Sequence, residues 1–280
     1  MPPAGIIPMQ VRWAPIRLVR RLMVNRIFSG AAYYYSRYRP PYPQALLQDV
    51  VRQTVGTSGR HMVDWGCGTG EAALPLSSFF AEVVAVDIDA EMIALAREKA
   101  AAQHVVNVRW VVGPAESLDL SDGSTDLIVA GSSFHWMDRE LLARRAHRAL
   151  TERGAIGIIG GGSNVWDVTC GWHEVAVTTL KRWLGEHRRA GSGTYTVAKK
   201  HEDYLEPAGF QLECRDYRVE HVWTADSIVG FLYSTSFASP AVLGERREGF
   251  EADLRAGLAR LSSADSFPEV LDFYLMIGRR

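Results

Sequence analysis

Short apolar runs alternate with alanine-rich amphipathic segments from residue 60 onward. The apolar runs predict strands at 60–65, 83–87, 108–112, 126–130 and 155–159. The segments between them, at 71–80, 90–102 and 140–150, carry apolar residues at helical spacing. Strands that alternate with helices of this length form right-handed βαβ units. The pattern therefore predicts an α/β fold with a Rossmann-like, doubly wound and mostly parallel sheet.

The pattern changes after three consecutive glycines at 160–162. Residues 163–205 and 225–262 are predicted to be helical insertions, and 211–222 and 270–277 to be two further strands. The sheet is then seven-stranded, and both insertions follow its fifth strand. We expect a cofactor-binding core at 28–162 and a second part at 163–280, whose insertions form a cap over the carboxyl edge of the sheet.

The N-terminal segment is strongly basic. Residues 1–48 contain seven arginines and no acid, and within 1–27 the apolar positions from Trp13 to Ile27 recur at helical spacing. This predicts a basic amphipathic helix. Such a helix packs on its own domain, on a second copy of the chain, or over the active site as a lid; a membrane surface or an acidic partner is the alternative.

Composition narrows the function classes further. The chain has 280 residues, and 31 basic against 32 acidic side chains give a net charge of −1, which argues against a nucleic-acid partner. Its three widely spaced cysteines fit a reducing compartment and lack a zinc-binding spacing, so no metal is predicted. Because no apolar stretch is long enough to span a membrane and no signal peptide is recognisable, we expect a cytoplasmic protein without membrane insertion.

The most informative segment is a glycine-rich turn between a predicted strand and a predicted helix. Gly66, Gly68 and Gly70 let backbone N–H groups approach a ligand there, and Asp87 ends the next strand, where this fold places a carboxylate for ribose hydroxyls. The spacing differs from that of dinucleotide sites, and Asp64 would repel a pyrophosphate but attract an ammonium group. This favours S-adenosylmethionine (SAM) over NAD, whose binding by a dehydrogenase is the alternative.

These segments resemble a known family. Residues 64–70 and Val86-Asp87-Ile88-Asp89 are similar to the first two motifs of the class I SAM-dependent methyltransferases, and residues 113–118 are similar to the third. Residues 28–43 resemble the segment that precedes the core in the subgroup with trans-aconitate methyltransferase and many natural-product enzymes. The resemblance covers residues 28–160 well and is looser beyond them. It implies methyl transfer to a small molecule, with S-adenosylhomocysteine (SAH) as product.

The resemblance also implies roles for matching residues. Asp64 would anchor the methionine ammonium, Asp87 would hold the ribose, and Ile88 would pack on the adenine. The other implied cofactor-binding residues are Tyr35, Gly66, Gly68, Gly70, Ala115, Glu116 and Ser132. Many relatives have aspartate at Pro114, so here Glu116 or water is expected to meet the adenine amino group.

Direct in-line displacement from a sulfonium requires a base only if the acceptor loses a proton. His135 follows the fourth strand and is the predicted catalytic residue, with His173 in the first insertion as a second candidate. For both histidines, packing or a loop hydrogen bond is the alternative role.

The substrate is predicted from the side chains of the insertions. Their aromatic residues are Trp166, Trp172, Trp183, Tyr195, Trp223, Phe231, Tyr233 and Phe237. If several point inward, the acceptor is an apolar or aromatic natural product from secondary metabolism. Arg39 and the pair Lys199-Lys200 favour instead a small carboxylic acid. A non-catalytic SAM-binding scaffold is a further alternative.

Overall fold

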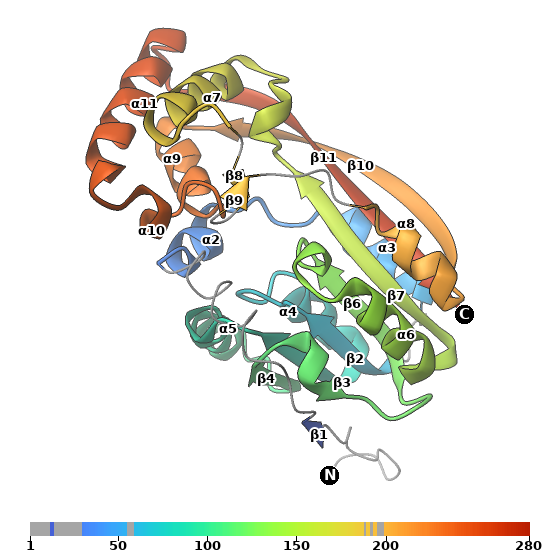
Figure 1. Cartoon of the computed structure of the whole chain (residues 1–280). Helices are drawn as coiled ribbons and strands as arrows, with labels where there is room; N and C mark the ends of the chain where they lie inside the picture. Colours follow the sequence, from blue (N-terminus) through green and yellow to red (C-terminus); the bar gives the residue numbers. More distant parts are fainter. Residues whose placement is uncertain (1–11, 14–29, 55–58, 188, 191–192, 195–198) are drawn as a thin grey trace.

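Seven strands form the central sheet of the computed structural model (Figure 1). Their spatial order is β10, β11, β7, β6, β2, β3, β4. The bounds are β2 Gly59–Trp65, β3 Phe80–Asp87, β4 Val108–Val112, β6 Thr125–Gly131, β7 Leu150–Gly162, β10 Gln211–Trp223 and β11 Phe267–Arg279. β11 runs antiparallel to both of its neighbours, and the other pairs are parallel. The structure describes residues 12–13, 30–54, 59–187, 189–190, 193–194 and 199–280.

Helices cover both faces of the sheet. They are α2 Ala32–Tyr38, α3 Gln44–Thr54, α4 Ala73–Leu76, α5 Ala90–Ala102, α6 Arg139–Ala149, α7 Gly171–Leu184, α8 Glu202–Leu205, α9 Ala225–Tyr233, α10 Pro240–Leu243 and α11 Arg247–Leu261. Alternate strand residues point to opposite faces, so Met62 packs with α3 and α5 while Val63 packs with α6 and α8. Both strand faces are therefore apolar, as expected for a buried parallel sheet.

Several short elements complete the described chain. The 3₁₀ turns are η1 Ser77–Phe79, η2 Ala115–Ser117, η3 Phe134–Trp136, η4 Val165–Asp167, η5 Glu206–Ala208 and η6 Gly244–Arg246. Two small antiparallel pairs join β1 Arg12–Trp13 to β5 Leu118–Asp119 and β8 Arg189–Ala190 to β9 Gly193–Thr194.

A long two-stranded ribbon carries the cap. β10 and β11 pair along their whole length, from Gln211 opposite Arg279 to Trp223 opposite Phe267. β11 pairs with β7 only from Asp272 onward, so the other half of the ribbon extends beyond the core sheet. The helices α7, α9, α10 and α11 gather at that end (Figure 1).

The short helix α2 connects this cap to the core. The ring of Tyr34 packs edge-on against Tyr233 of α9, with centroids 5.1 Å apart, and the Tyr38 hydroxyl donates to Asp226 at 3.2 Å. Gly230 of α9 leaves room for the Tyr38 ring, which a Cβ at this position would meet at 2.3 Å. α2 is thus held between the cap and the carboxyl ends of the core strands.

The predicted Rossmann-like fold is confirmed, and two local predictions are wrong. The helix predicted at 71–80 spans only α4, because the Ser77 hydroxyl donates to the Leu74 carbonyl at 2.7 Å, a 3₁₀ turn follows, and Phe80 already begins β3. Trp13, placed in the predicted N-terminal helix, lies in β1, because the backbone at 12–13 pairs with β5. The rest of that helix and its role as a lid lie outside the described residues. Among the described helices, none is long and apolar enough to cross a membrane.

Candidate cofactor-binding site

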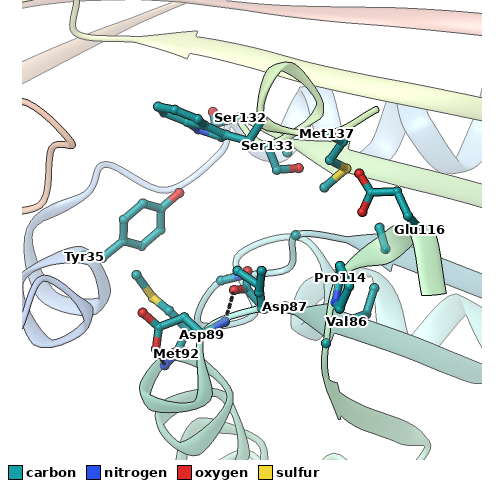
Figure 2. A pocket seen from close by; sticks show the side chains of 17 residues that line it. Tyr35, Val86, Asp87, Asp89, Met92, Pro114, Glu116, Ser132, Ser133 and Met137 are labelled. Carbon is teal, nitrogen blue, oxygen red and sulfur yellow. Dashed lines mark hydrogen bonds between the residues drawn. The ribbon is translucent and has the colours of Figure 1, made fainter. Parts of the chain in front are cut away.

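A cavity opens at the carboxyl ends of β2, β3 and β6 and beside the loop after β4. Its lining residues are Tyr35, Gly66, Gly68, Val86, Asp87, Ile88, Asp89, Met92, Gly113, Pro114, Ala115, Glu116, Gly131, Ser132, Ser133, Trp136 and Met137. Side chains of separate segments converge on it, with Tyr35 on one side and Glu116 on the other (Figure 2). This is the crevice where doubly wound sheets bind their ligands.

The glycine turn forms the floor of the cavity. The backbone N–H groups of Gly66 and Cys67 both donate to the Val86 carbonyl, at 2.8 and 3.0 Å, and this pulls the turn against β3. Gly66 has φ +67°, and a Cβ there would lie 2.5 Å from the Ser133 Cβ. Gly70 is not among the cavity residues, since it packs against the Leu74 side chain.

Asp87 is held in place by the turn itself. One carboxylate oxygen accepts from the Gly68 N–H and the other from the Asp89 N–H, each at 2.9 Å (Figure 2). Burial, as the main cause, raises the pKa of Asp87 to about 6. The group is therefore largely ionised at neutral pH, and the second lone pairs of its oxygens remain for ligand hydroxyl groups.

Asp64 is a buried carboxylate without a hydrogen-bond partner. The residue is 1% exposed, and neither oxygen is hydrogen-bonded within the described chain. It adjoins a narrow extension of the site together with Glu71, Tyr35 and Tyr42. Burial and then the Glu71 carboxylate raise the pKa of Asp64 to about 8. The group therefore mostly keeps its proton at neutral pH in the ligand-free protein, and it matches a cationic ligand group that displaces this proton on binding.

The opposite end of the cavity suits a flat, weakly polar group. Ile88, Pro114, Ala115 and Met137 offer apolar surface there. One oxygen of Glu116 accepts from the Asp138 N–H at 2.8 Å, which fixes the carboxylate beside Met137 (Figure 2). Ile88, Ala115 and Glu116 thus all line the same cavity.

Tyr35 and Ser132 line both this cavity and a second cavity that adjoins it. Of the three consecutive tyrosines, Tyr35 lines the cavity, whereas Tyr33 is exposed and Tyr34 packs on the cap. Burial raises the pKa of Tyr35 to about 12, so its hydroxyl keeps its proton at neutral pH. Ser132 adopts φ +51°, a left-handed backbone conformation that is uncommon for non-glycine residues.

His135, the predicted general base, lies outside the lining of this cavity. It lies in η3, is exposed, and is absent from the residues that line the cavity, although its neighbour Trp136 lines it. Neighbouring protein groups lower its pKa to about 4, chiefly by displacing water and then through His201 and Arg139. A base this weak without access to the cavity is poorly suited to accept a proton there.

A second cavity adjoins the first through Tyr35 and Ser132. It is lined by Tyr35, Arg39, Pro40, Tyr42, Glu71, Ser132, Gly161, Gly162, Ser163, Phe231 and Phe273. The Arg39 guanidinium lies between the rings of Tyr35 and Phe231, 5.1 and 5.0 Å from their centroids, and its Nε donates to the Ser234 hydroxyl at 2.9 Å. We refer to these eleven residues as the acceptor cavity.

The sequence patterns do not predict several residues of the acceptor cavity. Glu71 follows the last glycine of the turn directly, and its carboxylate accepts from Lys99 at 2.9 Å and from the Thr69 hydroxyl. Tyr42 stands in a Pro-Tyr-Pro motif, which only predicts an extended segment. Phe273 alternates with outward-facing residues of β11 and looked like ordinary core.

The predicted aromatic pocket is smaller than expected. Of the aromatic residues proposed from the insertions, Phe231 lines the acceptor cavity, while Trp172, Trp223 and Tyr233 are buried in the cap. Tyr195 lies outside the described residues. Lys199 and Lys200 are exposed and do not line the cavity, which leaves Arg39 as its cation among the described residues.

The matching family model and the two curated relatives named below are all described as methyltransferases. Residues 63–158 match the family model described as "Methyltransferase domain". The chain is 28% identical to a probable SAM-dependent methyltransferase of Saccharomyces cerevisiae, over 47% of this chain and 45% of that protein. It is 29% identical to a malonyl-[acyl-carrier protein] O-methyltransferase of Bacillus cereus, over 43% of this chain and 45% of that protein. The chain spans about half the length of the curated relatives it matches.

A solved structure shares the fold. Phosphoethanolamine N-methyltransferase 2 of Haemonchus contortus, in complex with phosphomonomethylethanolamine and SAH, aligns with a TM-score of 0.55 at 17% identity. The alignment covers 95% of this chain and 61% of that one. At this identity the likeness establishes the fold alone.

Proposed function

The chain belongs to the class I SAM-dependent methyltransferases, and on this basis we propose that it transfers the methyl group of SAM to a small carboxylic acid with an apolar body. SAM is its cofactor. The proposal rests on the shape and charge of the two adjoining cavities. The finer substrate assignment comes from the side chains of the acceptor cavity.

The observation that carries the proposal is the presence of three carboxyl groups at the cofactor site. Asp87 and Glu116 line the cavity and Asp64 lines its extension, and we assign Asp64 to the ammonium, Asp87 to the ribose hydroxyls and Glu116 to the adenine. The residues found to line the cavity include no arginine or lysine. A pyrophosphate would find no counter-charge from them, so the site favours SAM over a dinucleotide.

The residues around the donor act mainly by positioning. SAM, when bound, supplies a methyl group that passes to the acceptor by direct displacement. Tyr35 and Ser132 line both cavities, so they define the passage through which donor and acceptor meet. The nearby carboxylates of Asp64, Glu71 and Asp87 favour a cationic donor through electrostatic attraction. Holding two reactants in line accelerates displacement without a proton transfer.

Arg39 supports a carboxylate on the acceptor. It is the cation found to line the acceptor cavity, and its contacts with Ser234, Tyr35 and Phe231 hold the guanidinium in one orientation. The Bacillus cereus relative is described as an O-methyltransferase of a malonyl group, which carries a carboxylate. A carboxylate is already nucleophilic at neutral pH, so its methylation needs no base such as His135.

We expect Arg39→Gln to raise the KM for a carboxylic acid acceptor by about 10- to 100-fold, because a charge-assisted hydrogen bond contributes about 1.5–3 kcal/mol. Production of SAH would be measured with aromatic and aliphatic acids, each paired with its primary amide. Arg39→Lys keeps the charge and is the matched control, expected to retain part of the preference for acids. An equal loss of activity toward acids and amides would contradict the assignment of the carboxylate to Arg39.

A further inference from the structure

Three side chains of metal-binding type lie together outside both cavities, where α7 meets β11. They are Cys170, His173 and Glu269, and one ligand atom from each lies within 4.8 Å of the other two. The His173 and Glu269 side chains are 1% and 4% exposed, and Cys170 is partly exposed. Cys170 is the N-cap of α7 and His173 lies in its first turn, so the helix fixes both side chains relative to each other.

The spacing of these atoms is close to that of a metal site. His173 Nε2 and Glu269 Oε1 are 3.1 Å apart. Two ligands that each bind zinc at about 2.0–2.1 Å, near the tetrahedral angle, lie roughly 3.3–3.4 Å from each other. A small separation of the pair would therefore admit zinc, and Cys170 offers a third donor within 4.8 Å of both.

Hydrogen bonds from neighbouring groups orient the Glu269 and His173 side chains. The Trp223 indole N–H donates to Glu269 Oε2 at 2.7 Å, so Oε1 is left to face His173. The Thr169 hydroxyl lies 3.3 Å from His173 Nδ1 and can accept the Nδ1–H, which directs the Nε2 lone pair toward Oε1. Metal ligands are commonly oriented by such partners.

The same contacts also explain how the cluster is stable without metal. The Thr169 backbone N–H donates to Nδ1 at 3.2 Å, and in that tautomer Nε2–H donates to Glu269. Metal binding then requires loss of the Cys170 thiol proton, a change of the His173 tautomer, and release of the Thr169 backbone N–H, which cannot donate to a protonated Nδ1.

A surface hollow provides access and a fourth ligand position. Cys170, Glu269 and His221 line it, and the His221 ring packs on Trp223 with centroids 4.4 Å apart. A metal ion at the triad would meet solvent through this hollow. Thiolate, imidazole and carboxylate together suit zinc better than calcium or magnesium, which prefer oxygen ligands.

We propose that Cys170, His173 and Glu269 bind one zinc ion, with water from the hollow as the fourth ligand. The ion joins α7 of the first insertion to β11, and thereby fastens the cap to its ribbon. The Ser163 hydroxyl, which also lines the acceptor cavity, lies 3.1 Å from His173 Nε2, so a zinc ion on Nε2 takes the place of this hydrogen bond.

Zinc and cobalt binding to the full chain, purified without a histidine tag and stripped with a chelator, tests this proposal. We expect one equivalent of Zn²⁺ in competition with a chromophoric chelator, and a thiolate-to-metal charge-transfer band with Co²⁺. Cys170→Ser should abolish the band and lower zinc affinity by at least about tenfold. Cys214→Ser, which removes an exposed free thiol, is the matched control and should change neither.

A second readout covers variants that fold poorly. Zn²⁺ should raise the melting temperature of the wild type and of Cys214→Ser, but not that of Cys170→Ser or Glu269→Gln. SAH affinity should be nearly unchanged in Cys170→Ser, because the triad lies outside the cofactor cavity. Failure of the wild type to bind zinc, or equal zinc binding by Cys170→Ser, would overturn the proposal and leave the cluster as a hydrogen-bonded His–Glu pair.

Discussion

Asp64→Asn is expected to lower the affinity for SAH by roughly 30- to several-thousand-fold, since removing one partner of a buried charge pair costs about 2–5 kcal/mol. The carboxyl group is buried and mostly protonated in the ligand-free protein at neutral pH, so its negative charge is stabilised chiefly by the ligand ammonium. Asparagine keeps the size of the side chain and removes only the charge. Calorimetric titration with SAH measures the effect, and unchanged affinity would contradict the assignment of the ammonium to Asp64.

The same substitution should stabilise the ligand-free protein at alkaline pH. The pKa of Asp64 is raised to about 8 in the folded state, against about 3.9 in an unfolded chain. The folded protein therefore binds more protons between these values, and its stability falls as pH rises from about 4 to 8. Asp87, whose pKa is raised to about 6, adds to this slope at the acidic end.

Thermal melts at pH 5 and pH 8 measure this effect. We expect the melting temperature of Asp64→Asn to exceed that of the wild type at pH 8 and to approach it at pH 5. An equal difference in melting temperature between Asp64→Asn and the wild type at pH 5 and at pH 8 would show that Asp64 is not the titrating group. Asp126→Asn is a suitable control. Asp126 accepts hydrogen bonds from the N–H groups of Arg60 and His61, so its replacement should destabilise the protein.

Gly66→Ala should destabilise the protein by about 2–6 kcal/mol and weaken SAH binding. The residue has φ +67°, a conformation that costs a non-glycine residue about 1–3 kcal/mol. Its new Cβ would lie 2.5 Å from the Ser133 Cβ, and forced repacking adds about 1–3 kcal/mol. Ser133 lines the cofactor cavity, so its displacement also disturbs the ligand.

Gly123→Ala is the matched control for this substitution. Gly123 has φ +62°, but no atom lies within 4 Å of the position that a Cβ would take, and the residue is absent from the cofactor cavity. It should show the conformational cost alone, about 1–3 kcal/mol, with unchanged SAH affinity. Denaturant unfolding and SAH titration of both variants separate the two effects. Equal losses of unfolding free energy and equal SAH affinities for Gly66→Ala and Gly123→Ala would mean that close packing of the turn on Ser133 contributes neither to stability nor to binding.

The strands of the core could be predicted because each is an apolar run bounded by turn residues. β4 and α5 have the predicted bounds, since Asp89 caps α5 by accepting the N–H groups of Glu91 and Met92. The predicted bounds of β7 and β11 were too short, because glycines at 160–162 and polar residues of the ribbon interrupt the apolar pattern. Long antiparallel pairing gives such residues a strand conformation that their own sequence does not indicate.

The site was predictable only where it depends on local sequence. Asp87 and the glycines follow from one strand–turn–helix segment, and the structure places Asp87, Gly66 and Gly68 in one cavity. The acceptor cavity joins residues from 35 to 273, and no local pattern indicates that Phe231 and Phe273 meet Arg39. The Cys170–His173–Glu269 cluster is equally non-local, which is why the spacing of the cysteines predicted no metal. His135 was chosen for its position after a strand, but the 3₁₀ turn η3 places it outside the cavity.

Calorimetric titration of the full chain with SAH, beside an equal titration with NADH, tests the central claim most directly. The carboxyl groups of Asp64, Asp87 and Glu116, at a cavity whose described lining contains no arginine or lysine, predict one SAH bound per chain and no binding of NADH. Binding of NADH without SAH would contradict the account, because it would place a pyrophosphate where the structure provides carboxylates.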